Sequence, residues 1–584
     1  MIFLFEDSKH AHPTGRMVPR VAAPVWADVV AIVLLAVVAV LIFHGVGEMR
    51  QSLTALNDTS VTLDPRRLPE YALLTTLRMF AALAASLVFT FTVATLAAKS
   101  RKAELLIIPA LDILQSVPIL GFLTFTVTFF MGLFPGRQLG VECAAIFAIF
   151  TSQAWNMAFS FYQSLRTIPG DLDEVSRQFG FSPWRRFLRL ELPFATPGLV
   201  WNTMMSMSGG WFFVVASEAI TVGDTTVKLP GIGSWLALAI AQENFGAVAW
   251  AVFAMAVVIV LYDQLVFRPV VAWADKFRFE QTASRERPRS WVYDLVRRTK
   301  LLPSLISLLA FPARAFTLLD RAGSASRPAV KQNARAERVT NRLWIGVVVV
   351  ACLGASVLVG RFITTSLSVS DVVAAIGLGL ATMARVAVLI VIASIIWVPI
   401  GVWIGLRPAW AERLQPVAQF MAAFPANVLF PFAVIGIIGL KLNPNIWLSP
   451  LIILGTQWYI LFNVIAGASA LPNDLKEAAR IFGMRGWQRW RQFILPGIFP
   501  FYVTGALTAS GGSWNASIVA EAVSWGDRHL EAAGLGSFIA NATEAGDLPR
   551  VALGIAVMSV FVIAFNRILW RPLYSFAERR LRLD

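Results

Sequence analysis

The residues whose types and spacing could do chemistry gather in two polar, arginine-rich stretches, 171–199 and 473–501, each between long apolar segments. The two stretches align without a gap at an offset of 303 residues, which pairs Glu174 with Glu477 and places a glycine six residues after each glutamate. An acid in a first helical turn suits the positive end of the helix dipole, and Gly483 permits a tight turn. No nucleophile–base arrangement or metal cluster accompanies them. The pattern therefore predicts a rigid helix and turn that receives force from a partner.

The elements that hold these stretches are predicted to lie in a membrane. Hydrophobic residues make up 57% of the chain and charged residues 15%, with a mean hydropathy of +0.66. A soluble chain of 584 residues could not keep such a surface wet. Cys143 and Cys352 both fall in apolar segments, so no disulfide framework is indicated.

A spanning helix needs about 20 mostly apolar residues. Twelve such segments are expected, six in each half: 24–46, 72–97, 105–134, 140–163, 194–219 and 247–271, then 343–360, 373–405, 412–440, 446–470, 497–522 and 549–571.

The repeat extends beyond the polar stretches. The matched pairs include Trp211 with Trp514, Glu218 with Glu521 and Gly231 with Gly534 at an offset of 303, and Arg78 with Arg385, Pro109 with Pro416 and Pro118 with Pro425 at 307. Agreement at so many fixed positions indicates a fused duplication. The net difference of four residues is expected in the third or fourth span or in the loop between them.

Basic residues set the expected orientation. Residues 272–342 hold 15 Lys and Arg against 6 Asp and Glu, which is typical of a cytoplasmic connector. The short loops that contain the polar stretches are also rich in arginine, so both termini are expected in the cytoplasm and the two halves form a parallel repeat. Within the connector, a broken apolar run either lies on the lipid surface or belongs to a flexible tether.

The second polar stretch resembles the cytoplasmic loop of binding-protein-dependent ABC importer permeases. The residues that carry the resemblance are Glu477-Ala478-Ala479, Gly483, Phe493 and Leu495-Pro496. The first copy departs from the pattern, with Val175-Ser176 in place of the two alanines and Leu190 before Leu192-Pro193. The Gln115-Ser116-Val117-Pro118 turn and the glycine-rich loop after the fifth span look like the nitrate, sulfonate, taurine and bicarbonate branch.

The resemblance implies an all-α membrane protein of about 12 transmembrane helices in two parallel six-helix repeats, the type I ABC importer permease fold. The implied domains are a cytoplasmic N-terminus (1–23), a first permease domain (24–276, coupling loop 168–192), a basic cytoplasmic linker (277–341) and a second permease domain (342–584, coupling loop 471–496). The implied ATPase-coupling residues are Glu174, Gly180, Leu192, Pro193, Glu477, Ala478, Ala479, Gly483, Leu495 and Pro496.

The resemblance also implies the partners. Two copies of an ABC ATP-binding subunit would bind ATP and Mg on the cytoplasmic side of a bacterial inner membrane, and a periplasmic solute-binding protein would deliver a small solute. This chain is expected to bind no cofactor and no nucleic acid and not to be an enzyme. The phosphate-binding pattern GxxxxGK[ST] is absent from its sequence.

Polar and aromatic residues inside the spans are candidates for the pathway or its gate, because polar groups are costly in lipid. They are Asp112, Gln115, Gln153, Trp155, Trp211 and Glu218 in the first half, and Gln419, Gln457, Trp458, Trp514 and Glu521 in the second. Bridging between helices is the alternative for each of them. The two glutamates are expected near the outer boundary, either in gating or as helix caps, and Arg78 and Arg385 are expected to extend outward to water.

Two other functions are compatible with parallel repeats. One is a secondary transporter or channel that works without ATP, and the other is a membrane scaffold without transport activity. The paired coupling loops favour the importer over both.

Overall fold

The computed structural model describes residues 25–49, 61–115, 117–222, 225–277, 290–299 and 334–580. The first half contains α1 (Val25–Glu48), α3 (Leu68–Phe89), α4 (Thr95–Lys99), α5 (Arg101–Leu114), α6 (Leu123–Leu133), α7 (Gln138–Arg166), α8 (Gly170–Gln178), α9 (Pro183–Arg186), α10 (Leu192–Glu218), β1 (Ala219–Val222), β2 (Thr225–Lys228), α11 (Ile232–Ala241), α12 (Phe245–Tyr262), α13 (Arg268–Ala274) and α14 (Trp291–Arg298).

The second half follows the same order. It contains α17 (Ala334–Ser366), α18 (Val369–Gly405), α19 (Pro408–Ala423), α20 (Phe430–Gly439), α21 (Pro444–Trp447), α22 (Ser449–Leu454), α23 (Gln457–Ala470), α24 (Asn473–Ile481), α25 (Gly486–Arg489), α26 (Leu495–Ala520), β3 (Ala522–Trp525), β4 (Arg528–Glu531), α27 (Leu535–Glu544), α28 (Leu548–Phe565) and α29 (Arg571–Arg580).

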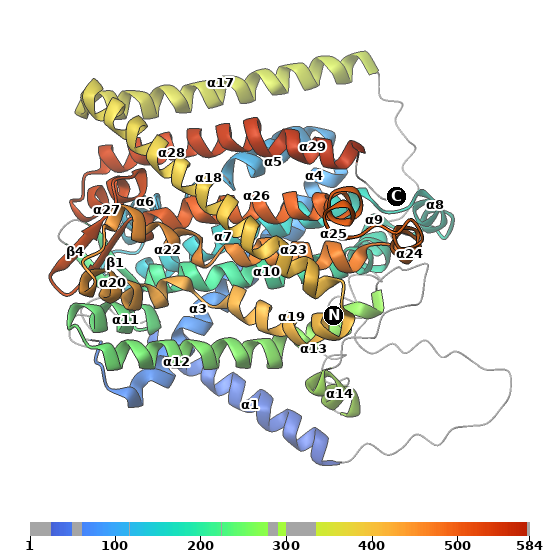
Figure 1. Ribbon diagram of the computed structural model, residues 1–584, viewed down its shortest axis with the longest axis horizontal. Coiled ribbons are helices and arrows are strands. Elements are labelled where there is room, and N and C mark those ends of the chain that lie inside the picture. Colours follow the sequence, from blue (N-terminus) through green and yellow to red (C-terminus); the bar gives the residue numbers. More distant parts are fainter. Residues whose placement is uncertain are drawn as a thin grey trace.

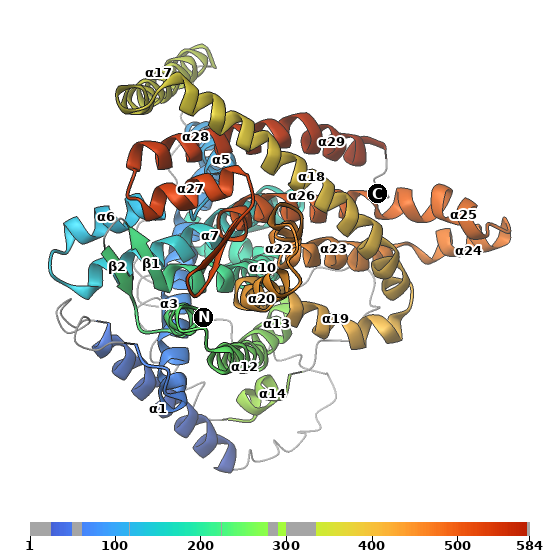
Figure 2. The same ribbon diagram turned by 60° about the vertical axis from the view of Figure 1, so that its left-hand side comes forward.

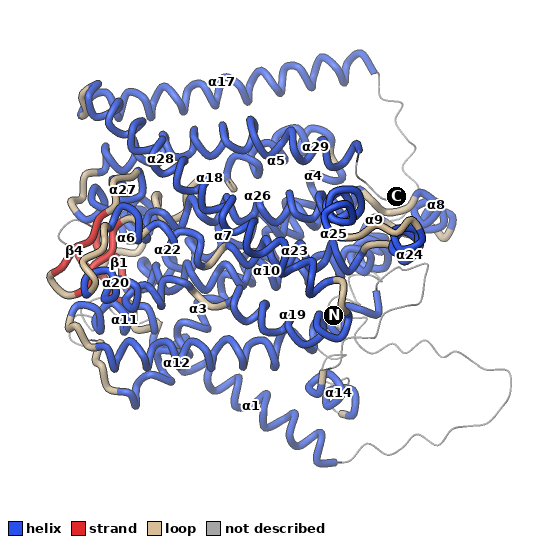
Figure 3. The backbone as a smooth tube through the Cα atoms, in the orientation of Figure 1, coloured by secondary structure: helices blue, strands red, loops and turns tan. Residues whose placement is uncertain are grey.

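The helices form a bundle with two different ends (Figure 1). The short helices α8, α9, α24 and α25 project at one end, which we call the coupling end. Two antiparallel hairpins, β1–β2 and β3–β4, lie at the opposite end, which we call the hairpin end (Figure 3). Helices α1 and α17 lie at opposite edges of the bundle in two views (Figures 1 and 2).

All twelve predicted segments contain helix, and the all-α fold is confirmed apart from the two short hairpins. Among the described residues, five helices are long and apolar enough to cross a membrane, or seven if each bent pair counts as one span. The segment 105–134 is not one helix but α5 and α6, separated by a turn. Its counterpart, α19 followed by α20, bends by 80°.

The duplication is visible in local geometry. π-helical turns occur at Phe187–Glu191 and Asp263–Phe267, and again at Trp490–Ile494 and Asn566–Trp570, both pairs at the 303 offset. The halves differ in the fourth segment, where α7 is continuous but its counterpart is divided into α21, α22 and α23.

Two of the hydrogen bonds that join the two halves pair a side chain of the second half with the backbone of the first. The backbone N–H of Ile119 donates to the side-chain oxygen of Asn515 at 2.6 Å. The side chain of Asn427 donates to the backbone oxygen of Phe212 at 3.2 Å. In both cases, the turn between the two helices of a half's third segment contacts the long fifth helix of the other half. The repeats therefore pack as one body.

Candidate functional site

The coupling loops, 168–192 and 471–496, have the same geometry. In each, a short helix ends at a glycine with positive φ, +62° at Gly180 and +65° at Gly483. The N–H of Gly180 donates to the oxygen of Arg177, and that of Gly483 donates to Arg480, as in a helix that ends in a left-handed cap. A Cβ at either glycine would meet nothing within 4 Å. Backbone conformation rather than crowding is therefore the reason for glycine here.

Each coupling loop runs directly into a long helix. In the second half, α25, the π-helical turn and α26 form one helix over Gly486–Ala520. Pro496 lies at its N-terminal side, where the missing N–H disturbs the helical ladder, and the π-helical turn comes just before it. Leu192, Pro193 and Leu495 occupy the same junctions in the two halves. A helix of this length spans about 50 Å, so it joins the coupling end to the hairpin end.

The predicted coupling residues divide between surface and core. Glu174 and Glu477 are exposed on α8 and α24. Ala479 is buried, and Ala478 is half-buried. The alanine side of α24 therefore faces the bundle, while its glutamate stays available to a partner.

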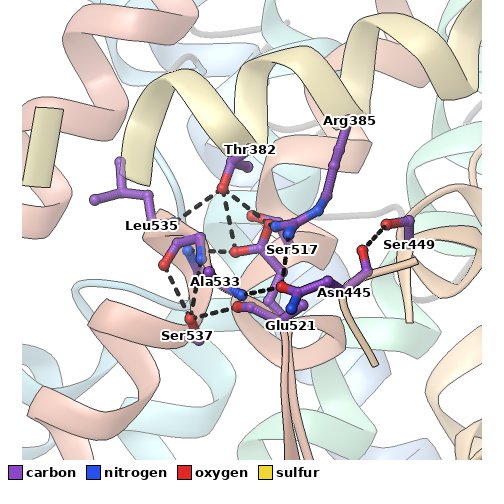
Figure 4. Close-up of polar contacts among 12 residues, drawn as sticks. Thr382, Arg385, Asn445, Ser449, Ser517, Glu521, Ala533, Leu535 and Ser537 are labelled. Atoms are coloured by element: carbon purple, nitrogen blue, oxygen red, sulfur yellow. Dashed lines mark hydrogen bonds and ion pairs between the residues drawn. The ribbon is translucent and has the colours of Figure 1, made fainter. Parts of the chain in front are cut away.

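At the hairpin end, the second half holds a buried carboxylate in a cluster of donors (Figure 4). Glu521 accepts hydrogen bonds from the hydroxyl of Thr382 at 2.8 Å and from the guanidinium of Arg385 at 2.9 Å. The backbone N–H of Gly536 donates to the same carboxylate at 2.7 Å. Thr382 in turn accepts from the N–H of Leu535 at 2.9 Å. We call this arrangement a carboxylate clasp, because it ties α18, α26 and the start of α27 together.

The first half has the same clasp with one more acid. Arg78 contacts Glu218 at 2.7 Å and also forms a two-pronged pair with Glu142, at 2.7 Å for each hydrogen bond. Gly233 donates to Glu218 at 2.7 Å, and Thr75 accepts from the N–H of Ile232. All three charged side chains are at most 1% exposed.

Asn445 replaces Glu142 in the second half, where it accepts from Arg385 at 3.4 Å. These two residues are related by the 303 offset. The net difference of four residues therefore lies between Pro118 and Glu142, within the region that the sequence predicted.

The clasp explains the glycine-rich loops. A Cβ at Gly534 would lie 2.2 Å from a carboxylate oxygen of Glu521, and one at Gly231 would lie 2.3 Å from Glu218. At Gly233 and Gly536, a Cβ would meet backbone oxygens of α10 and α26 at 2.2 and 2.3 Å. These glycines allow the loop to pack directly against the acid. Close packing therefore explains the glycines, in addition to the tight turn that the sequence predicted.

The prediction that Arg78 and Arg385 extend outward to water was wrong. Arg78 is fully buried, and the Arg385 side chain is 15% exposed. Each has an acidic partner within the bundle, which offsets the cost of leaving water. Sequence reasoning did not single out Thr75, Thr382 and Glu142, although the first two stand at the 307 offset three residues before each arginine.

The other polar candidates mostly bridge helices. In the first half, Gln153 is buried beside Ser86 and Met207, and Trp155 packs edge-on against Phe89. In the second half, Gln457 accepts a hydrogen bond from the indole N–H of Trp397, against which Trp458 also packs. Gln419 donates a hydrogen bond to the sulfur of Met204 in the other half. Trp211 packs edge-on against Tyr262 and Trp514 stacks on Phe561. Gln115 is exposed after α5, and the side chain of Asp112 lies outside the described set. Their contact with a solute stays a prediction.

A cavity of about 80 Å³ lies between the two halves. Ser208 and Gly209 of α10 and Gly512 of α26 contribute to its wall. The remaining lining residues are Phe212, Phe213, Ala422, Phe424, Ala426, Leu451, Gly455, Thr456, Tyr459 and Ala516. Its lining contains no charged side chain and none of the predicted pathway residues. A second cavity of about 250 Å³ includes Gln419.

Comparison with known proteins identifies the class. Residues 90–268 and 397–571 each match the family described as binding-protein-dependent transport system inner membrane component. Because the two matches together cover more than half of the chain, it belongs to this family. The match of both halves confirms the internal duplication and the resemblance stated from the coupling loops.

Relatives with assigned roles match one stretch of the chain. The chain is 28% identical over 189 residues to the bicarbonate transport system permease protein CmpB of Synechococcus elongatus, which covers 32% of this chain and 64% of that protein. It is 26% identical over 186 residues to the nitrate import permease protein NrtB of Leptolyngbya laminosa, covering 32% and 63%. The matched stretch thus spans just under two thirds of these relatives.

Proposed function

We propose that this protein is the transmembrane permease of an ATP-driven ABC importer, with both permease domains in one chain. Two copies of an ATP-binding subunit would dock at the coupling end, with ATP and Mg bound there and no cofactor bound by this chain. A periplasmic solute-binding protein would deliver the solute at the hairpin end. In this arrangement the protein crosses the bacterial inner membrane, and both termini face the cytoplasm.

The observation that carries the proposal is the continuity of each coupling loop with a long helix. Both loops project at the same end of the bundle (Figure 1). The long helices that follow the loops, α10 and α26, both line the cavity between the two halves, and each ends at the glutamate of a carboxylate clasp. A partner that draws the loops together upon binding ATP would therefore move both walls of the cavity and both clasps at once.

The lining of the 80 Å³ cavity indicates how strongly this chain could bind a solute. Its wall offers aromatic rings, glycines and the side chains of Ser208, Thr456 and Tyr459, without a fixed charge. Such a surface would bind a small anion weakly, because it offers no positive charge. We therefore assign selectivity to the binding protein and propose a small anion of the nitrate, sulfonate, taurine or bicarbonate class as the solute.

Co-purification tests the assembly. The chain, expressed with its neighbouring ATP-binding and solute-binding proteins, is expected to retain the ATP-binding subunit after mild solubilisation. Absence of any ATP-binding subunit, together with uptake that persists when ATP is depleted and the ion gradient is held, would overturn the proposal.

Charge reversal tests the loops directly. Glu174→Lys combined with Glu477→Lys removes the exposed acid that each docking helix offers to the partner and reverses its charge, while leaving the bundle untouched. We expect uptake to be abolished and membrane insertion to be normal. Asp294→Lys, on exposed α14 outside the coupling loops, serves as the control and should transport normally. If cells that carry the double variant take up the solute normally, transport does not depend on these loops, as expected if the chain is a scaffold and another protein carries the solute.

A further inference from the structure

The two coupling loops differ in how they are held. In loop 1, Asp173 pairs with Arg177 at 2.8 Å and also with Arg186. Arg186 contacts Glu191 at 3.2 Å, and Glu191 pairs with Lys99 at 2.9 Å. This chain of ion pairs joins α8 to α9, to the π-helical turn and to the end of α4. Loop 1 is therefore braced within the permease.

Loop 2 keeps the two arginines that are paired in loop 1 but loses the acids that pair with them. At the 303 offset, Arg480 and Arg489 stand where loop 1 has Arg177 and Arg186, but Lys476 replaces Asp173 and Ile494 replaces Glu191. Leu406 replaces Lys99 at the 307 offset. Among the described residues, no ion pair joins the side chains of loop 2. Its arginines at 480, 485, 489 and 491 are all exposed.

The net charges differ accordingly. Residues 171–193 carry four acids against four arginines, for a net charge of zero. The equivalent residues 474–496 carry two acids against five basic residues, for a net charge of +3.

One exposed apolar position is matched in the two loops. Phe179 in loop 1 is 74% exposed, and Phe482 at the same position in loop 2 is 75% exposed. Apolar contact at this position would therefore stabilise both docking contacts to a similar degree. Loop 2 also exposes more apolar surface elsewhere, since Trp487 is 72% exposed against 39% for Trp184 at the same position. Salt dependence therefore isolates the contribution of charge.

We propose that the second coupling loop is the electrostatic anchor of the complex, docking into an acidic cleft of an ATP-binding subunit, whereas the first is a preformed, charge-neutral contact. This inference rests on the proposed function. The two paired arginines of loop 1 already form charge-assisted bonds with acids of the same loop. Their counterparts in loop 2 lack these acids, so they are available to form such bonds with carboxylates of a partner. Docking at loop 2 should be the more sensitive to salt, because screening acts on exposed charges.

Photocrosslinking at matched positions tests this. Phe179 or Phe482 is replaced by p-benzoylphenylalanine in the full complex, and the yield of crosslinks to the ATP-binding subunit is measured in low and high salt. Between about 0.1 M and about 1 M salt the screening length falls from about 10 Å to about 3 Å, and we expect the loop 2 yield to fall at least about fivefold and the loop 1 yield less than about twofold.

Exchanging one residue between the loops provides the second arm. Lys476→Asp restores the acid that loop 1 uses and should reduce the salt dependence of loop 2 to that of loop 1. Asp173→Lys frees Arg177, removes one of the two acidic partners of Arg186 and should make loop 1 salt-dependent. Lys476→Arg keeps the charge and should behave as the unaltered protein.

The outcomes separate the two proposals. If neither probe crosslinks an ATP-binding subunit at any salt concentration, the proposed function fails. If both probes crosslink but respond equally to salt, or loop 1 responds more, the importer stands and the anchor inference is overturned.

Discussion

Arg78 and Arg385 occupy equivalent positions with unequal surroundings. Arg78 faces two buried carboxylates, whereas Arg385 faces one carboxylate and the amide of Asn445. Removing one partner from a buried ion pair leaves the other charge without compensation. The first-half arginine is therefore the more important for stability.

We predict that Arg78→Met lowers the free energy of unfolding by about 3–5 kcal/mol, and that Arg385→Met lowers it clearly less. Denaturant titration of the purified proteins in detergent measures the free energy of unfolding of both variants. Equal losses, or a larger loss for Arg385→Met, would contradict the importance given to Glu142.

The glycines of the clasp give a second prediction. Gly536→Ala places a methyl group 2.3 Å from the backbone oxygen of Ser517, which cannot move without distorting α26. We expect a loss of about 1–3 kcal/mol, the usual range for overpacking. Gly511→Ala, on α26, would place its methyl group where nothing lies within 4 Å, and it is the control. If the two variants melt at the same temperature, the close approach at the clasp is not needed.

At the scale of elements, the hairpin β3–β4 connects the two halves. Trp525 is 8% exposed and packs in the hydrophobic core formed mainly by first-half residues. The N–H of Gly526, which has a positive φ, donates to the oxygen of Ile240 at 3.0 Å. The hairpin of one half thus closes over the α11–α12 turn of the other.

Trp525→Ala should therefore destabilise the contact between the halves. We expect a loss of about 3–5 kcal/mol, typical of a large buried aromatic side chain, seen as a lower melting temperature. Arg528→Ala, at an exposed position on the same hairpin, should leave the melting temperature nearly unchanged. A normal melting temperature for Trp525→Ala would show that the hairpin does not lock the halves.

The sequence was informative where a pattern repeats. The 303 offset predicted the duplication, and the coupling-loop glycines predicted turns that the structure confirms as left-handed caps. The hairpins were not predicted, because each strand is only four residues long, and β3 (Ala522–Trp525) and β4 (Arg528–Glu531) together hold a single β-branched residue. The partners of Arg78 were missed because Glu142 and Glu218 are 64 and 140 residues away, and only the fold brings them together.

The whole molecule combines two pseudo-equivalent halves whose corresponding parts have diverged. The first half has the extra buried acid and the braced coupling loop, and the second has the neutral asparagine and the basic loop. Fusion in one chain allows such divergence, since each half always meets the same partner half. The shared features, the continuous helices and the clasps, are those that the proposed transport cycle requires in both.

Transport in proteoliposomes tests the central claim most directly. The chain is reconstituted with its ATP-binding subunits, and the loaded solute-binding protein is added at the hairpin end. We predict solute accumulation only when ATP and Mg are present on the coupling-loop side, and none for the Glu174→Lys, Glu477→Lys double variant. Accumulation driven by an ion gradient without ATP, and unaffected by the double variant, would contradict the account.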